Sequence, residues 1–203
     1  MHPLRPSSKH SSSSSSPSWS PPPRLPTSQK ASDHSRKREN LRLEPKRRSR
    51  LPRRLIVMRH AKSSWKEDGL DDHDRPLNKR GIRDAPRMAD AIHDRAWSPD
   101  LILVSSSKRT LQTLSGMSHR FGRVPSQIRP GIYHATVNDL MLELEDMPQE
   151  GTTMILGHNP GSEILVNHLS GEWHSMPTAT AVLLVESRGN WAVQEAIRPK
   201  EIQ

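Results

Sequence analysis

Short apolar runs alternate with segments of helical periodicity along the second part of the chain. Four runs, rich in Leu, Ile and Val, are typical of strands that are buried on both faces of a parallel sheet. They cover residues 54–60, 100–106, 152–158 and 180–186. A fifth run, 191–197, follows a turn sequence and predicts an antiparallel hairpin partner at an edge of the sheet.

Amphipathic segments between these runs predict the helices. Asn78 is placed to cap a helix over residues 79–95, whose apolar positions are three and four residues apart. Its predicted buried face consists of Ile82, Ala85, Met88, Ala89 and Ile92. Further helices are expected over residues 107–121, 137–147 and 161–171. This alternation predicts an α/β fold, a three-layer α/β/α sandwich with a mostly parallel central sheet.

Residues 1–52 differ in composition from the rest. They are rich in Ser, Pro and basic residues and poor in apolar side chains, so we expect a disordered basic tail before a domain of residues 53–203. Residues 1–54 carry 14 Lys and Arg against 3 acidic residues, whereas residues 55–203 carry 17 against 19. The high net charge therefore belongs to the tail. A weak contact between the tail and nucleic acid is one interpretation. The others are a merely solvated tail and upstream sequence translated from a wrongly placed start codon.

Several classes of protein do not fit this composition. The chain has no cysteine, which excludes disulfides and cysteine nucleophiles. No apolar run reaches the ~20 residues of a membrane span, and the N-terminus lacks the apolar segment of a signal peptide. We expect a cytoplasmic protein without membrane contact, or an organellar one if the tail is a transit peptide.

Polar side chains with catalytic potential follow three of the predicted strands. Arg59 and His60 end the first run, Arg109 follows the second within a helical turn, and His158 and Asn159 follow the third. Ligands of open α/β sheets bind beyond the carboxyl ends of the strands. We therefore expect two arginines and two histidines at one edge of the sheet.

These residue types suit phosphoryl chemistry. The arginine fork matches a phosphate, and a neutral histidine among cations can attack phosphorus. A second histidine can stabilise the charge on the transferring oxygens. The chain has no Walker-type glycine loop and no carboxylate cluster for magnesium, so no cofactor and no metal are expected. Each segment alone also fits an ordinary turn or helix cap, and only their coincidence at three strand ends favours a site.

The remaining histidines lack this context. We expect surface or packing roles for them, with His134 as a candidate for the pocket wall because it follows Ile132 and Tyr133. Examples are His73, His93, His119, His134, His168 and His174.

The sequence resembles the histidine phosphatase superfamily, and within it the SixA-type phosphohistidine phosphatases. The matching segments run in order through most of residues 54–187: LIVMRHAKSSW, DDHDRPLNKRG, LILVSSSKRTLQT, IYHA, MILGHNPG and MPTATAVLLVE. Where this family commonly has Ser-Pro, the chain has Ser106-Ser107. The resemblance implies a phosphoglycerate mutase-like fold.

The resemblance also implies roles for individual residues. His60 is the phosphorylated nucleophile, Arg59 and Arg109 bind the phosphoryl group, and His158 completes the pocket, with Asn159 helping to close it. Two further residues, Lys62 and Ser63, follow the nucleophile and either bind substrate or shape the loop.

The general acid is left open. Larger relatives protonate an alkoxide leaving group with a carboxylate, and Asp71, Asp72 or Asp74 is placed in the loop after the first strand for this task. The same acids also fit a solvated loop. An imidazole leaving group needs an acid less, because it departs readily when its far nitrogen is protonated.

We therefore predict a phosphohistidine phosphatase that acts on a phosphohistidine-bearing protein, such as a phosphotransfer domain, through a covalent intermediate on His60. Two alternatives remain. One is a phosphatase for small phosphomonoesters, and the other is a phosphate- or phosphoprotein-binding module without turnover.

Overall fold

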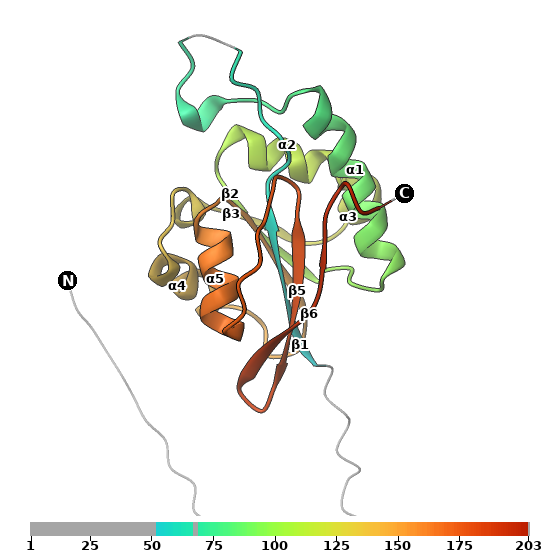
Figure 1. Ribbon diagram of the computed structural model, residues 1–203, viewed down its shortest axis with the longest axis vertical. Helices are drawn as coiled ribbons and strands as arrows, with labels where there is room; N and C mark the ends of the chain where they lie inside the picture. Colours follow the sequence, from blue (N-terminus) through green and yellow to red (C-terminus); the bar gives the residue numbers. More distant parts are fainter. Residues whose placement is uncertain (1–51, 67–68, 203) are drawn as a thin grey trace, which may run out of the picture. The chain divides into compact units, whose positions relative to one another are not determined.

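The computed structural model describes residues 52–66 and 69–202, so the predicted tail lies outside the described residues apart from Pro52. Within these ranges a six-stranded sheet has the strand order β3-β2-β4-β1-β5-β6, with helices on both faces (Figure 1). The strands are β1 (Arg53–Arg59), β2 (Leu101–Ser105), β3 (Ser126–Arg129), β4 (Gly151–Gly157), β5 (Ala181–Ser187) and β6 (Asn190–Ile197). The predicted α/β sandwich is confirmed.

Strand direction differs from the prediction at one strand. The neighbours β3, β2, β4 and β1 are parallel, but β5 is antiparallel to β1 and forms a hairpin with the edge strand β6. The expectation that residues 180–186 form a parallel strand was therefore wrong. An apolar run indicates burial on both faces, which the first four residues of β5 share with the parallel strands, and carries no information on direction.

Strand β3 was not predicted. Its sequence, SQIR, is mostly exposed, and it pairs only with β2 at the other edge of the sheet. An edge strand of this kind has no apolar run to reveal it.

The two faces of the sheet bury separate apolar clusters. Along β1, Ile56 and Met58 belong to the cluster that also contains residues of α1 (Lys79–Asp94). Leu55 and Val57 belong to the cluster that contains residues of α4 (Val137–Glu145) and α5 (Gly161–Ser170). This alternation is the two-residue period of a strand. It places helices α1 to α3 and helices α4 and α5 on opposite faces (Figure 1).

The helices agree with the predicted segments in most of their length. They are η1 (Asp72–Asp74), α1 (Lys79–Asp94), α2 (Lys108–Gly116), α3 (Ser118–Phe121), η2 (Pro130–Ile132), α4 (Val137–Glu145) and α5 (Gly161–Ser170). The segment predicted as one helix over 107–121 is divided at Met117 into α2 and α3. None of the helices in the described ranges is long and apolar enough to cross a membrane.

Helix α1 begins as predicted but buries a shorter face. The side chain of Asn78 accepts a hydrogen bond from the Gly81 N–H at 3.0 Å, which confirms the cap. Ile82, however, is 63% exposed, so its predicted place in the core was wrong. The first turn of α1 lies over the loop that follows β1, because a Cβ at Gly81 would lie only 2.3 Å from the Lys62 carbonyl oxygen. The sheet therefore offers nothing for Ile82 to pack against.

Candidate active site

The carboxyl ends of three adjacent strands form the site. Arg59 pairs with Gly157 in the parallel β1–β4 ladder, so the next residues, His60 and His158, lie side by side. The His60 N–H donates to the Gly157 carbonyl at 3.0 Å, and the two imidazole centroids are 5.1 Å apart. Ser105, at the end of β2, bonds to His158 from the third strand. The strand order β2-β4-β1 thus brings together residues nearly 100 positions apart.

Hydrogen bonding orients the His60 ring. Its Nδ1 lies 2.7 Å from the carbonyl oxygen of Ala61. Because a carbonyl oxygen only accepts, Nδ1 must carry the proton, and in the neutral ring Nε2 is left with its lone pair. The backbone here is held in turn, since the Ala61 N–H donates to Thr113 Oγ1 and the Ala179 N–H donates to the His60 carbonyl, both at 3.0 Å. His60 therefore presents a fixed nucleophilic nitrogen.

Burial keeps both imidazoles neutral. Desolvation is the main cause that lowers the pKa of His60 to about 4, and the positive charges of Arg109 and Arg59 act in the same direction. Desolvation likewise lowers the pKa of His158 to about 3, assisted by His60 and Arg109. At neutral pH both rings are uncharged and carry a single ring proton, which is the state that a histidine nucleophile requires.

The two ring nitrogens of His158 differ in their hydrogen bonding among the described residues. Its Nε2 shares a hydrogen bond of 2.8 Å with the Ser105 hydroxyl, and the Ser107 hydroxyl lies 3.5 Å away. Its Nδ1 is buried and has no hydrogen-bond partner among the described residues. The edge of Tyr133 packs near the ring, with centroids 5.6 Å apart. A ligand oxygen would give this orphaned nitrogen a partner.

Arg59 also has an unused donor. Its Nη1 donates to the Met176 carbonyl at 2.9 Å, while its buried Nε has no partner within the described ranges. Asn159 donates from Nδ2 to the same carbonyl at 3.0 Å. The Met176 carbonyl thus links Arg59 to Asn159 and holds the guanidinium beside the nucleophile, where it affects the His60 pKa.

Arg109 is held by an acid of the loop after β1. Its guanidinium, 5% exposed, donates from Nη2 to Asp72 Oδ2 at 2.9 Å and from Nη1 to the Asp72 carbonyl. A guanidinium has five N–H groups, so three remain for an anion. Since α2 begins at Lys108, Arg109 also stands on the first turn of a helix, where backbone N–H groups and the dipole favour negative charge.

Asp72 connects several of these groups. It accepts from Arg75 Nη1 at 2.7 Å and from the Tyr133 hydroxyl at 3.0 Å, and His134 Nε2 lies 3.4 Å from Oδ2. Desolvation raises its pKa, but the bonds from Arg75 and Tyr133 and the charge of Arg109 outweigh that cause and hold the pKa well below its usual range. Asp72 is therefore ionised at neutral pH. It orients cations and is not a reservoir of protons.

Two histidines, His134 and His73, lie near Asp72 at the rim of the site. His134 stacks on Tyr133 with centroids 4.1 Å apart, and its expected place at the pocket wall stays a prediction. His73, which we expected to be a surface or packing residue, meets the edge of Tyr133 and shares a 3.0 Å hydrogen bond with the Ser106 hydroxyl. The sequence signal for this cluster is the IYHA segment, which has no periodicity of its own.

The loop after the nucleophile is tied to Arg75 and to α1. The buried Ser63 hydroxyl accepts from Arg75 Nη2 at 2.8 Å, and the Lys62 carbonyl accepts from the Asn78 N–H at 2.9 Å. Ser63 thereby holds Arg75 against Asp72, which favours the loop-shaping interpretation for this residue. Substrate binding by the Lys62 side chain stays a prediction.

Among the described residues, no group of three or more His, Asp or Glu side chains could hold a metal ion.

The low pKa of His60 leads to a prediction for titration. A free imidazole has a pKa of about 6.5, whereas the His60 ring has a pKa of about 4 and therefore stays neutral until the pH falls to that range. In proton–carbon NMR spectra of the histidine rings, we expect the His60 signal to stay in place from pH 8 to about pH 5 and to move below that range. The His60→Ala variant assigns the signal by its loss. A His60 midpoint near 6.5 would contradict the burial argument.

Comparison with known proteins agrees with this geometry. Residues 55–150 match the model of the histidine phosphatase superfamily, branch 1. An uncharacterized chloroplastic protein of Arabidopsis thaliana is 35% identical over 152 residues, which cover 70% of each chain. The crystal structure of a proposed phosphohistidine phosphatase SixA from Agrobacterium tumefaciens is 28% identical, with a TM-score of 0.67 over 73% of this chain and 99% of that one.

A third similarity concerns the fold alone. The structure of the protein histidine phosphatase SixA complexed with tungstate is 21% identical, with a TM-score of 0.66 over 72% of this chain and 97% of that chain. The family model, the Arabidopsis relative and the 28%-identical structural neighbour lead to one assignment. The chain belongs to the histidine phosphatase superfamily, in its SixA-type branch, and is a phosphatase.

Proposed function

We propose that this phosphatase hydrolyses protein-borne phosphohistidine through a covalent intermediate on His60. The observation that carries the proposal is the pair formed by His60 and Asp72. His60 offers an unprotonated Nε2 next to unused donors, whereas Asp72, the carboxylate at the pocket rim, is ionised by its bonds to Arg75, Tyr133 and Arg109. The site is thus equipped with a nucleophile and anion donors but not with a protonated Asp72.

In the first step Nε2 of His60 attacks phosphorus, and the bond between phosphorus and the substrate imidazole breaks. The electron pair of that bond stays on the leaving nitrogen. Because the far nitrogen of the substrate ring carries a proton, the ring departs as neutral imidazole and needs no acid. Arg59, Arg109 and Nδ1 of His158 bind the phosphoryl oxygens and stabilise their charge.

In the second step water attacks the same phosphorus atom, inorganic phosphate forms, and the proton from water passes to phosphate or solvent. His60 is now the leaving group, and its Nδ1–H still donates to the Ala61 carbonyl. The carbonyl stabilises the positive character of the phosphorylated ring. Both steps therefore expel an imidazole, so a substrate with a phosphorus–nitrogen bond suits the site better than an ester that expels an alkoxide.

A comparison of substrates tests this proposal. One substrate is a phosphotransfer domain that has been phosphorylated on histidine with phosphoramidate, and the other is O-phosphoserine, an ester that expels an alkoxide. We expect kcat/KM for the phosphodomain to exceed that for the alkyl ester by at least about 100-fold, equivalent to about 2.7 kcal/mol of transition-state stabilisation. Phosphate release is measured beside the loss of phosphohistidine, and heat-inactivated protein controls for spontaneous hydrolysis.

Two results would overturn the proposal. Efficient hydrolysis of the alkyl ester alone would assign the chain to small phosphomonoesters. Binding of phosphate without turnover of either substrate would assign it to the binding modules.

As to compartment, the chloroplastic name of the Arabidopsis relative supports the organellar alternative for this chain.

A further inference from the structure

A surface groove lies directly beside the loop that carries the nucleophile. It runs between the residues that follow His60 and the first turn of α1, and we call it the α1 groove. Its lining consists of Lys62, Ser63, Ser64, Trp65, Lys66, Leu77, Asn78, Lys79, Arg80 and Ile82. None of the catalytic groups described above lies in this lining, so the groove is separate from the phosphoryl pocket.

Large apolar side chains are exposed along the α1 groove. Trp65 is 73% exposed and Ile82 is 63% exposed. Trp65 is nevertheless supported from one side, because the Arg75 guanidinium lies 3.1 Å from the centroid of its ring. Arg75 is itself fixed by Ser63 and Asp72. A supported aromatic ring with an open face is typical of protein interaction sites.

The charged side chains that the structure describes in the α1 groove are all cationic. Among the described residues, which do not include Glu67 and Asp68, the lining contains Lys62, Lys66, Lys79 and Arg80 and no Asp or Glu. In the described part of the chain, none of these three lysines has a carboxylate within ion-pair distance. The described lining therefore offers cations without an ion-pair partner among the described residues, around an apolar centre.

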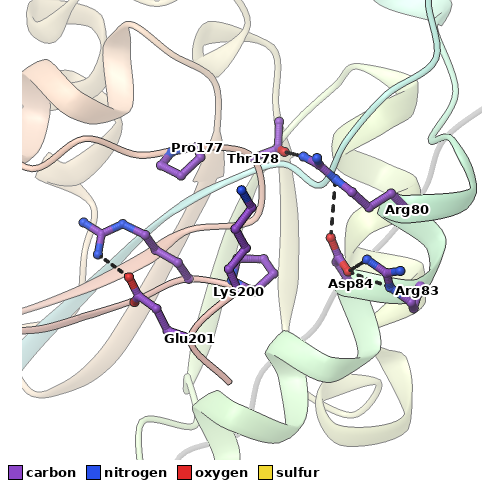
Figure 2. Close-up of a pocket in the computed structure, with 9 residues that line it drawn as sticks. Arg80, Arg83, Asp84, Pro177, Thr178, Lys200 and Glu201 are labelled. Atoms are coloured by element: carbon purple, nitrogen blue, oxygen red, sulfur yellow. Dashed lines mark hydrogen bonds and ion pairs between the residues drawn. The ribbon is translucent and has the colours of Figure 1, made fainter. Parts of the chain in front are cut away.

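A second pocket continues this basic surface. It shares Arg80 with the groove and is lined in addition by residues of the C-terminal segment, among them Arg198 and Lys200 (Figure 2). Its two acids are already paired, Asp84 with Arg83 at 3.0 Å and Glu201 with Arg198 at 2.9 Å.

The position of Arg80 joins the two hollows. Its Nη2 donates to Thr178 Oγ1 at 2.8 Å, and its Nε lies 3.7 Å from the buried Asp84 carboxylate. In Figure 2 the Lys200 amino group extends toward Pro177 and Thr178. Lys200 has no ion-pair partner in residues 52–66 and 69–202, so its charge too is available to a partner.

Both hollows flank the nucleophile. Lys62 follows His60 by two residues, and Thr178 precedes Ala179, whose N–H donates to the His60 carbonyl at 3.0 Å. A small phosphorylated molecule that reaches His60 has no need of these surfaces. A macromolecule whose phosphohistidine reaches His60 must cover the surface around the pocket entrance.

We propose that the α1 groove and the second pocket, which have Arg80 in common, together form a docking surface for the protein that carries the phosphohistidine. This protein presents acidic side chains beside an apolar one. The inference rests on the proposed function. The groups of the docking surface are complementary to such a partner: cations for its carboxylates, and Trp65 with Ile82 for its apolar side chain. Docking raises kcat/KM for the protein substrate and leaves the chemical step unchanged.

Three substrates test the docking surface. Two are phosphohistidine peptides of equal length that carry either Glu or Gln on both sides of the phosphohistidine, and the third is N-phosphoimidazole. With wild-type protein at low salt, we expect kcat/KM for the Glu peptide to be about tenfold that for the Gln peptide, since each exposed charge pair contributes a fraction of a kcal/mol. The ratio should fall as salt screens the charges.

Matched charge variants locate the effect. Lys79→Glu combined with Lys200→Glu reverses one cation in each hollow and should abolish the preference for the Glu peptide. The control, Arg123→Glu combined with Arg188→Glu, makes the same change of charge at the opposite end of the sheet, where Arg123 precedes β3 and Arg188 lies in the β5–β6 turn. This control should keep the preference for the Glu peptide. All four positions are exposed, so folding should be preserved. Neither pair should alter the rate with N-phosphoimidazole.

Trp65→Ala tests the apolar part of the docking surface. We expect KM for both peptides to rise severalfold while kcat and the rate with N-phosphoimidazole stay unchanged.

The outcomes separate the two proposals. Equal kcat/KM for the Glu and Gln peptides with wild type, or an unchanged preference in the Lys79 and Lys200 variant, would overturn the docking surface and leave phosphohistidine hydrolysis standing. If wild type hydrolyses neither peptide nor N-phosphoimidazole, the proposed function fails and the docking inference fails with it.

Discussion

Substitution of His60 by Ala is expected to reduce kcat/KM by at least about 10⁴-fold on every phosphorylated substrate, because the atom that forms the covalent bond is removed. No neighbouring side chain can replace the His60 imidazole as the nucleophile. His158 lies nearby, but its Nε2 is bonded to Ser105, and the two centroids are 5.1 Å apart. Rapid acid-free quenching and mass spectrometry should detect a phosphate adduct on the wild-type chain and none on the variant.

Anion binding by the same variant provides the control. Arg59, Arg109 and His158 remain in the His60→Ala protein, so tungstate or phosphate should still bind with an affinity within about tenfold of wild type, or 1.4 kcal/mol. Retained turnover, or a phosphate adduct on another residue, would refute the assignment of the nucleophile.

Substitution of Arg109 by Ala is expected to lower kcat/KM by about 10²- to 10³-fold, the range seen when one donor to a developing charge is removed. Its guanidinium is buried, stands on the first turn of α2 and has N–H groups left over from its bonds to Asp72. The variant should also lose affinity for tungstate, which distinguishes it from His60→Ala. Isothermal titration measures that loss directly.

Arg109→Lys separates charge from geometry. Lysine keeps the positive charge but offers no fork, so it cannot bond to Asp72 and to an anion in the same way. We expect it to recover a minor part of the activity, with the same thermal unfolding temperature as Arg109→Ala within a few degrees. Activity within threefold of wild type in either variant would show that Arg109 is not a phosphoryl ligand.

Most of the fold was predictable from local pattern. The strands β1, β2 and β4 were visible as apolar runs because each is buried on both faces, and the start of α1 was visible because Asn78 is a cap. The exposed strand β3 and the antiparallel direction of β5 were not, since both depend on neighbours distant in the sequence. Ile82 was misplaced for a related reason, because helical periodicity does not say where the sheet ends.

The site divides in the same way. The sequence by itself determined which side chains follow strand ends, and parallel strands then had to bring Arg59, His60 and His158 to one edge. Only the tertiary structure decided the protonation and partners of these groups. The His60 tautomer depends on the distance to a carbonyl, and the ionised state of Asp72 depends on cations 3 and 37 residues away in the chain. Burial and through-space charge are properties of the packed chain, so no sequence pattern encodes them directly.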